Sequence, residues 1–259
     1  MSEFVKVNQE DSVCVITLNR PDAFNAFNLS LLKQLAGHLT ACAVDKSIRA
    51  VVLTGNGRAF CAGGDLKWAL GFDGGAAAGF HTLASQFHLA VLEIRRMAKP
   101  VIAAINGVAA GGGFSLALAC DFRVMGKSAK LVQAYTSSGL CIDGGGTFAL
   151  PRLVGLARAL EIAAFDEPIP ADKALQWGLV NSAVETGQEL EESLKMAGRL
   201  CRRSLHSFAL CKQLFTDSYN TSFETQMELE RQALARAAEH PDGREGLAAF
   251  TEKRKPEFI

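Results

Sequence analysis

Residues 100–125, PVIAAINGVAAGGGFSLALACDFRVM, hold the pattern that decides the fold class. The apolar run at 100–105 predicts a strand that is buried on both faces, and residues 122–125 predict another. A glycine-rich turn at 107–113 and an apolar helix over 114–119 lie between them. A strand, a helix and a second strand in this order form the βαβ unit of a parallel sheet.

The same alternation extends toward the N-terminus. Residues 12–18 and 49–54 predict strands, and apolar residues at helical spacing predict helices over 31–42, where Ser30 is a candidate cap, and over 76–97. After residue 153 the pattern becomes helical, with helices expected over 157–165, 171–177, 190–200, 205–216 and 222–238. The sequence therefore predicts an α/β protein with a helical C-terminal part.

Composition narrows the class of protein. The chain has 259 residues, 49% of them hydrophobic, and carries 27 basic and 27 acidic side chains, whereas a nucleic-acid binder usually shows a basic excess. No apolar run approaches the ~20 residues of a membrane span, and residues 1–9 lack the apolar segment of a secretion signal, so we expect a cytoplasmic protein. The cysteines and histidines show no metal-ligand spacing, so no metal site is expected.

Three glycine-containing turns, at 55–65, 107–113 and 139–146, follow predicted strands. Loops at the carboxyl ends of parallel strands are where α/β proteins place ligands. At 107–113 the free N–H groups of the following helix could hold a phosphate or a developing oxyanion, although a tight packing turn would have the same glycines. The turn matches neither a P-loop nor a dinucleotide-binding fingerprint.

Several motifs resemble the enoyl-CoA hydratase/isomerase (crotonase) superfamily. They are FCAGGDLK at 60–67, ING at 105–107, GGG at 111–113, LNRP at 18–21, ADKALQWGLV at 171–180 and AFTEKRKP at 249–256. Together they span essentially the whole chain. The resemblance implies a spiral of ββα units over residues 1–195 and a helical region over 196–259 that builds trimers, often paired into hexamers. It also implies a coenzyme A thioester as substrate and no cofactor besides.

The resemblance assigns roles to individual residues. The N–H groups of Gly64 and Gly112 would bind the thioester oxygen, and one such donor can contribute ~3–4 kcal/mol in the transition state. The other residues expected to contact substrate or CoA, or to brace these loops, are Ala62, Asp65, Leu66, Trp68, Gly111, Ser115, Tyr135, Phe250 and Lys253. Among them Ala62 and Leu66 would meet the adenine, and Phe250 and Lys253 would reach the CoA of a neighbouring subunit.

The carboxylates point to the reaction. The two positions where hydratases carry glutamates hold Ser115 and Tyr135, which are poor bases near neutral pH. Asp143 stands before Gly144–Gly146, where the isomerase branch has a carboxylate, and residues 131–152 are closest in pattern to the 1,2-epoxyphenylacetyl-CoA isomerases of the phenylacetate pathway. We therefore expect an isomerase with Asp143 as proton shuttle.

Other interpretations stay open at this stage. Asp143 could be a turn acid bonded to nearby N–H groups. The enzyme could be a hydratase that uses Asp143 and a bound water, or a CoA-binding member without turnover. The acyl group, the pathway and the choice between trimer and hexamer are also open. His38, His81 and His88 fall on predicted helices and are interpreted as surface or core residues.

Overall fold

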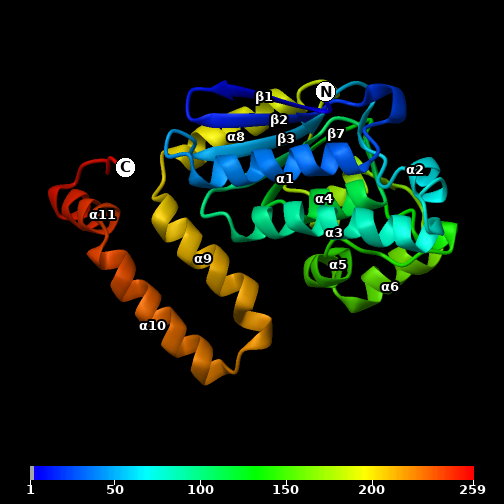
Figure 1. Cartoon of the computed structure of the whole chain (residues 1–259). Coiled ribbons are helices and arrows are strands. Elements are labelled where there is room, and N and C mark those ends of the chain that lie inside the picture. Colours follow the sequence, from blue (N-terminus) through cyan, green and yellow to red (C-terminus); the bar gives the residue numbers. More distant parts are fainter. Residues whose placement is uncertain (1–2) are drawn as a thin grey trace.

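The computed structural model describes residues 3–259, so Met1 and Ser2 of the N-terminal stretch lie outside it. Six strands form the larger sheet (Figure 1), in the order β1 (Val5–Glu10), β2 (Val13–Leu18), β3 (Ala50–Gly55), β5 (Val101–Ile105), β7 (Phe122–Gly126) and β10 (Ser182–Val184). Only the first pair is antiparallel. A smaller sheet contains β4 (Ala59–Cys61), β6 (Val108–Ala110), β8 (Lys130–Val132) and β9 (Ile169–Pro170).

Helices cover both faces of the larger sheet. Helices α1 (Leu29–Val44) and α3 (Gly75–Arg96) lie on one face, and α8 (Glu189–Cys201) lies on the other (Figure 1). Val51 and Leu53 belong to the core on the side of α1 and α3, whereas Val52, between them, packs with Ala197 of α8. This alternation explains why the strands read as uninterrupted apolar runs, and the predicted central strands are confirmed.

The remaining helices are α2 (Leu66–Leu70), α4 (Gly112–Ala119), α5 (Gly146–Val154), α6 (Leu156–Phe165), α7 (Ala171–Gln176), α9 (Leu205–Asp217), α10 (Phe223–Glu239) and α11 (Pro241–Glu252). Every residue of α4 is buried, so this helix is fixed inside the core. The α/β class with a helical C-terminal part is confirmed. The expected boundary between residues 195 and 196 falls within α8, and the division into two regions stays a prediction.

Helices α9, α10 and α11 extend away from the two sheets (Figure 1). A buried ion pair attaches α9 to the core: Lys212 Nζ donates to Asp121 Oδ2 at 2.8 Å and to the Ile94 carbonyl oxygen at 2.7 Å. Burial raises the pKa of Asp121, and Lys212 opposes that shift. Removing either partner would leave a charge buried without its counterion, so the pair fixes where the arm leaves the core.

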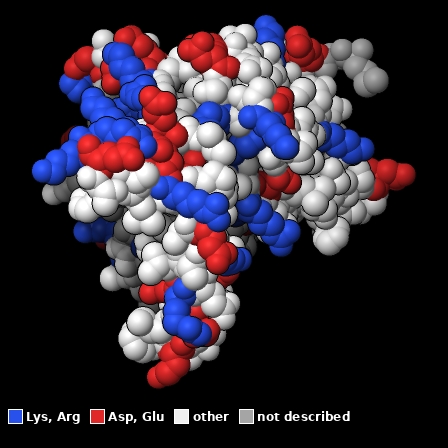
Figure 2. Space-filling view, turned by 90° about the vertical axis from the view of Figure 1, so that its left-hand side faces the viewer, with Lys and Arg blue, Asp and Glu red and all other residues white. Residues whose placement is uncertain are grey.

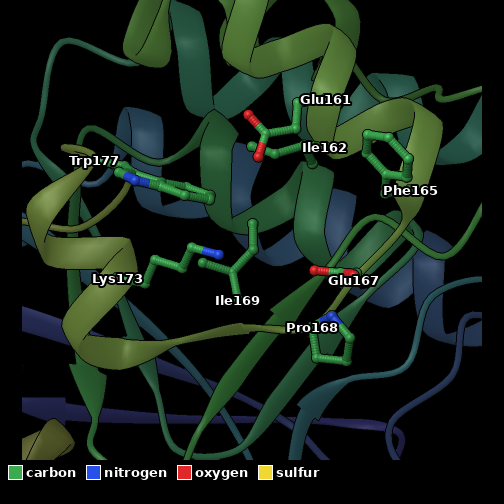
Figure 3. A pocket seen from close by; sticks show the side chains of 8 residues that line it. All are labelled: Glu161, Ile162, Phe165, Glu167, Pro168, Ile169, Lys173 and Trp177. Atoms are coloured by element: carbon green, nitrogen blue, oxygen red, sulfur yellow. The ribbon is translucent and has the colours of Figure 1, made fainter.

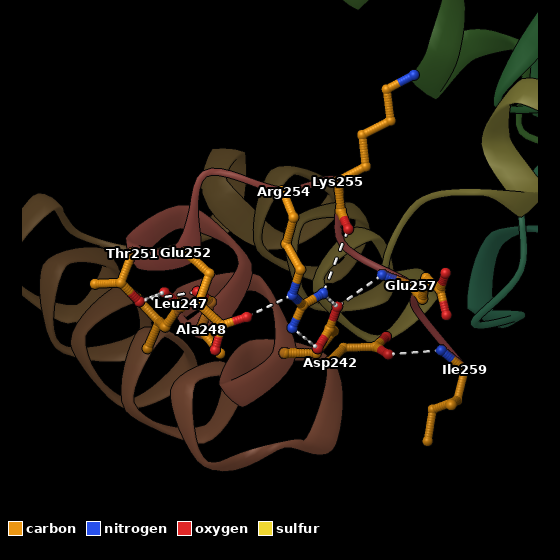
Figure 4. A network of polar contacts seen from close by, with 10 residues as sticks. Asp242, Leu247, Ala248, Thr251, Glu252, Arg254, Lys255, Glu257 and Ile259 are labelled. Atoms are coloured by element: carbon orange, nitrogen blue, oxygen red, sulfur yellow. Dashed lines mark hydrogen bonds and ion pairs between the residues drawn. The ribbon is translucent and has the colours of Figure 1, made fainter.

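The chain end folds back onto α11 (Figure 4). Arg254 pairs with Glu245 and with Glu252, each at 2.6 Å, and the backbone N–H of Glu257 donates to Glu245. The hydrogen bond from Arg254 is the main reason that the pKa of Glu245 is lowered to about 2. The last residues therefore have a defined path beside α11, while the side chain of Lys255 points away from this network.

The surface carries charges of both signs. Figure 2 shows basic and acidic side chains interspersed over one face of the molecule, without a large area of a single sign. Within residues 3–259, none of the helices has the length and apolar character needed to cross a bilayer.

Candidate active site

The side chain of Asn25, which is fully buried, anchors the first glycine loop (residues 55–65) through hydrogen bonds. Its Nδ2 donates to the carbonyl oxygens of Asn56 and Ala59 at 3.0 and 2.8 Å, and its Oδ1 accepts from the Arg20 N–H at 2.9 Å. Asn25 has a φ of 58°, in the left-handed region that asparagine tolerates better than most residues. Asn25 thus fixes β4 and the turn that precedes it.

The loops after β4 and β6 touch each other through glycines. Gly63 has a φ of 89°, and a Cβ there would lie 2.8 Å from the Gly112 nitrogen. Gly111, which precedes α4, has a φ of 53° and would bring a Cβ within 3.7 Å of the Gly63 Cα. Only glycine combines these backbone angles with so close an approach, so the two loops form one backbone surface.

On this surface, the N–H groups of Gly64 and Gly112 have no protein acceptor within residues 3–259. In the parallel bridge between Phe27 and Gly64, the hydrogen bonds run through the neighbouring residues Gly63 and Asp65. Gly112 is the first residue of α4, where helical N–H groups lack intrahelical partners. The geometry therefore leaves two backbone donors available for an anionic oxygen.

Asp65 braces the first loop. Its carboxylate accepts from the Trp68 N–H at 3.1 Å, which caps α2, and pairs with Arg20 at 2.7 Å. Partial burial favours the protonated acid, but the hydrogen bonds from Arg20 and Trp68 outweigh it, and the pKa of Asp65 is lowered. Trp68 lies against Phe72, with ring centroids 5.0 Å apart. Asp65 thus has the geometry of a capping residue.

Asp143 ends a chain of polar contacts that starts on α4. Ser115 Oγ lies 3.4 Å from the Tyr135 hydroxyl, which donates to Asp143 Oδ1 at 2.5 Å. Burial and the Asp143 charge raise the pKa of Tyr135, so Tyr135 keeps its proton and acts as a donor. Ser115 and Tyr135 are almost fully buried, whereas the Asp143 side chain is 35% exposed. The Asp143 carboxylate is therefore fixed by a hydrogen bond from a buried side chain, while part of its own surface stays exposed to solvent.

The loop that carries Tyr135 is pinned by a residue that the sequence did not single out. Asp166, just after α6, accepts from the N–H groups of Ala134 and Ser137 at 2.7 and 3.2 Å. Ala134 has a φ of 52°, an uncommon angle for a side chain with a Cβ, and such strain occurs often at functional sites. The lack of any local pattern linking residues 134 and 166 explains why sequence reasoning missed this contact.

His88, which was interpreted as an ordinary surface or core residue of its helix, lies at Asp143. Its Nε2 is 3.6 Å from Asp143 Oδ2 and accepts a hydrogen bond from the Gly144 N–H at 3.3 Å. Phe87, the preceding residue, faces the same loop, because a Cβ on Gly144 would lie 2.1 Å from its ring. Helix α3 therefore supplies one wall of this site.

Cys61 is the last residue of β4 and carries a thiol within the first glycine loop. It is fully buried, and burial raises its pKa to about 12, so its sulfur stays protonated. Its thiol lies 3.2 Å from the Asn25 carbonyl oxygen. Cys61 therefore packs as a small buried side chain.

Two hollows adjoin these elements. A groove of about 1250 Å³ runs between α9 and the core and reaches Gly144 and Gly145, directly after Asp143. A smaller pocket of about 270 Å³ opens between α6 and α7, where Glu161, Lys173 and Trp177 point toward one another (Figure 3). None of the predicted site residues lines either hollow, but the groove reaches the two glycines that follow the candidate base Asp143.

The remaining predicted residues lie at the surface. Ala62 and Leu66 are exposed beside the first loop. Phe250 is 84% exposed on α11, and Lys253 follows the end of that helix, well away from α2 and α4 (Figure 1). The structure thus brings Gly64, Gly112, Ser115, Tyr135 and Asp143 around one region, and leaves Phe250 and Lys253 outside it. No group of three or more His, Cys, Asp or Glu side chains in the described part of the chain could hold a metal ion.

Two touching glycine loops with free N–H groups, next to a carboxylate, define a site suited to an enolate. The sequence profile of the enoyl-CoA hydratase/isomerase family matches residues 8–259, and the chain belongs to that family. Among relatives, it is 37% identical over 259 residues to the 1,2-epoxyphenylacetyl-CoA isomerase of Escherichia coli (strain K12), covering 100% of this chain and 99% of the relative.

Other relatives carry the hydratase name. The 2,3-dehydroadipyl-CoA hydratase of Escherichia coli (strain K12) is 37% identical over 258 residues, which covers 100% of this chain and 99% of the relative. The crystal structure of an enoyl-CoA hydratase from Polaromonas sp. JS666 superposes with a TM-score of 0.94 at 37% identity, covering 98% of this chain and 99% of the other. The crotonase-type fold is confirmed, and the chain is an enzyme of the hydratase/isomerase family.

Proposed function

We propose that the protein is an acyl-CoA isomerase that shifts a double bond, or isomerises an aryl epoxide, in a CoA thioester. Asp143 removes a proton from the acyl chain, and the electrons move to the thioester oxygen. The N–H groups of Gly64 and Gly112 stabilise the resulting enolate oxygen. For a double-bond shift, the protonated Asp143 then returns the proton to a second carbon, so no proton is gained or lost overall.

The polar chain from Ser115 through Tyr135 to Asp143 carries this proposal. A hydratase with the usual pair of carboxylates would have them at positions 115 and 135, but these positions hold hydroxyl groups that keep their protons. The Tyr135 hydroxyl donates to Asp143 Oδ1, whereas Oδ2 accepts no hydrogen bond from residues 3–259. A single carboxylate with one free oxygen suits a proton that leaves one carbon and returns to another.

Helix α4 links the donors to the base. Gly112 and Ser115 lie three residues apart, about one helical turn, and both are buried. Because α4 is fixed in the core, Gly112 and the Ser115–Tyr135–Asp143 chain keep a constant separation. We infer that the thioester oxygen binds at Gly64 and Gly112 while the acyl group extends past Asp143 into the groove at Gly144 and Gly145, with Trp68 as an apolar wall.

The hydratase is the second candidate, and the hydratase names among the 37% identical relatives favour it. Purified protein assayed with a Δ3-enoyl-CoA, an aryl-epoxide-CoA and crotonyl-CoA separates the two activities, with products followed by mass spectrometry. We expect either isomerisation to exceed hydration by at least about tenfold, which corresponds to 1.4 kcal/mol in the barrier. Hydration that is much faster than both isomerisations would overturn the proposal, as would CoA binding without any turnover.

We further propose that the C-terminal region, residues 196–259, packs against other copies of the chain in a trimer or a dimer of trimers. It contains the end of α8 and helices α9, α10 and α11. Large apolar side chains stand exposed on these helices, namely Phe215, Phe223, Leu234, Leu247 and Phe250. Exposed apolar areas of this kind mark interaction surfaces. In such an assembly Ala62 and Leu66 would meet the adenine of the CoA bound to their own chain. Phe250 and Lys253 would contact the CoA bound to a neighbouring chain. Light scattering that gives the mass of a single chain would contradict this.

Two expectations complete the proposal. The reaction as written moves one proton and needs no group besides the CoA thioester, so we propose that no further cofactor takes part. We also propose a cytoplasmic enzyme, because the neutral net charge suits a protein that acts on a small soluble acyl-CoA substrate.

A further inference from the structure

We propose that His88 is a positioning residue that must be uncharged for Asp143 to act, so that His88 sets the acidic limit of turnover. The inference rests on the proposed function, in which Asp143 is the base. It starts from one atom, His88 Nε2, which faces two groups at once: the Gly144 N–H at 3.3 Å and Asp143 Oδ2 at 3.6 Å.

The two contacts exclude each other. A nitrogen that accepts from the Gly144 N–H uses its lone pair, so Nε2 carries no hydrogen in this arrangement and the imidazole is neutral. An Nε2 that carries a hydrogen cannot accept from Gly144, and it turns that hydrogen toward Asp143 Oδ2. The 3.6 Å separation is too long for a hydrogen bond but within reach of an ion pair.

Neutral His88 favours catalysis in two ways. It holds the Gly144 N–H, which directly follows Asp143 and thereby fixes the backbone at the base. It also leaves Oδ2 without a hydrogen-bond donor, while the Tyr135 hydroxyl occupies Oδ1. Asp143 Oδ2 therefore keeps its lone pairs for a substrate proton.

Protonated His88 reverses both effects. The Gly144 hydrogen bond is lost, and the imidazolium places a positive charge beside the carboxylate. A neighbouring positive charge favours the ionised carboxylate and so makes it a weaker base. Histidine is the side chain that ordinarily changes charge between about pH 5 and 8.

Within residues 3–259, no ionisable side chain other than Asp143 lies within ion-pair or hydrogen-bond distance of His88. Tyr135 acts on it only through Asp143. On α3 itself, His81 and Arg95 lie about two turns to either side. The ionisable side chains on the elements packed against α3, none of which contacts His88, are Lys33, His38 and Cys42 on α1 and Lys67 on α2, with Cys120 at the end of α4.

The test compares pH profiles of kcat/KM for the wild type and for His88→Gln. The glutamine carbonyl oxygen can still accept from the Gly144 N–H but cannot take up a proton in this range. We expect the acidic limb of the profile to move to lower pH by about one unit in the variant, because the side chain at position 88 can then no longer become charged. Each profile is normalised to its own plateau, so a lower absolute rate does not affect the comparison.

His81→Gln is the matched control, since His81 is exposed on the same helix. Its acidic limb should coincide with that of the wild type. If the limb of His88→Gln also coincides with the wild type, the inference is wrong. That result would leave the proposed function intact, because the proposed function fails instead if the Asp143 variant keeps its turnover.

A second measurement does not depend on turnover. Nuclear magnetic resonance of ¹³C-labelled histidine follows the charge of His88, whose signal is the one absent from His88→Gln. Coupling between two sites is reciprocal, so removing the carboxylate charge in Asp143→Asn should move the His88 titration to lower pH, by about half a unit for this partly exposed pair. An unchanged midpoint would overturn the inference.

Discussion

Asp143→Asn is expected to lower isomerase turnover by about 10³-fold, within the range that general acid–base catalysis contributes. The asparagine has the shape of the aspartate, and its carbonyl oxygen can still accept from the Tyr135 hydroxyl, which lies 2.5 Å from the carboxylate. Its amide group cannot remove or hold a proton from the acyl chain. Binding of a CoA thioester should persist, because Gly64 and Gly112 lie on other loops. Steady-state kinetics and calorimetry separate the two quantities.

Asp73→Asn is the appropriate control, because Asp73 is an exposed acid near the first loop. It should turn over like the wild type. If Asp143→Asn retained near-normal turnover, Asp143 would be a turn acid and the proposed function would be wrong. If thioester binding disappeared together with turnover, the loss would report a damaged fold, and Asp143 would have no demonstrated role as a base.

Gly64→Pro is expected to lower kcat by about 10² to 10³-fold, the cost of one lost oxyanion donor. Proline removes the N–H at position 64, which has no protein acceptor in the described part of the chain. A Cβ at this position has room, since the nearest atom to it is a Phe80 ring carbon at 3.9 Å. The change is therefore directed at the donor.

Gly64→Ala supplies the comparison, because it adds a Cβ in the same space and keeps the N–H. We expect it to retain turnover within about threefold of the wild type, as no transition-state donor is lost. Circular dichroism checks that both variants fold. Equal rates for the proline and alanine variants would show that the Gly64 N–H does not stabilise the transition state.

Elements with a clear apolar pattern were predictable from the sequence, and the others were not. The strands at β2, β3, β5 and β7 and the long helices carry enough residues for their apolar spacing to be read. Strands of the smaller sheet have two or three residues, too few to show a period. Strands β1 and β10 and helices α2, α5 and α11 were also missed. At α1 the cap is the Asn28 side chain, which accepts from the Leu31 N–H, so Ser30 as a candidate cap was wrong.

The residues of the candidate site also fall into those that a local sequence pattern predicts and those that it misses. Gly64, Gly112 and Asp143 stand in short motifs whose backbone shape is local, so the sequence could single them out. His88 and Asp166 act on the site through contacts across 56 and 32 residues, which no local pattern reveals. Both contacts depend on how α3 and α6 pack, and packing is decided by the fold as a whole.

The complete burial of α4 has a consequence for how such an enzyme can change its chemistry. In the proposed reaction, backbone groups anchored to a rigid interior bind the thioester oxygen, whereas Asp143, on a loop with a partly exposed carboxylate, handles the proton. We expect substitutions in that loop to change the reaction without disturbing the binding of the thioester. The architecture thus separates what must stay constant from what is free to diversify, and relatives of equal similarity can carry different activities.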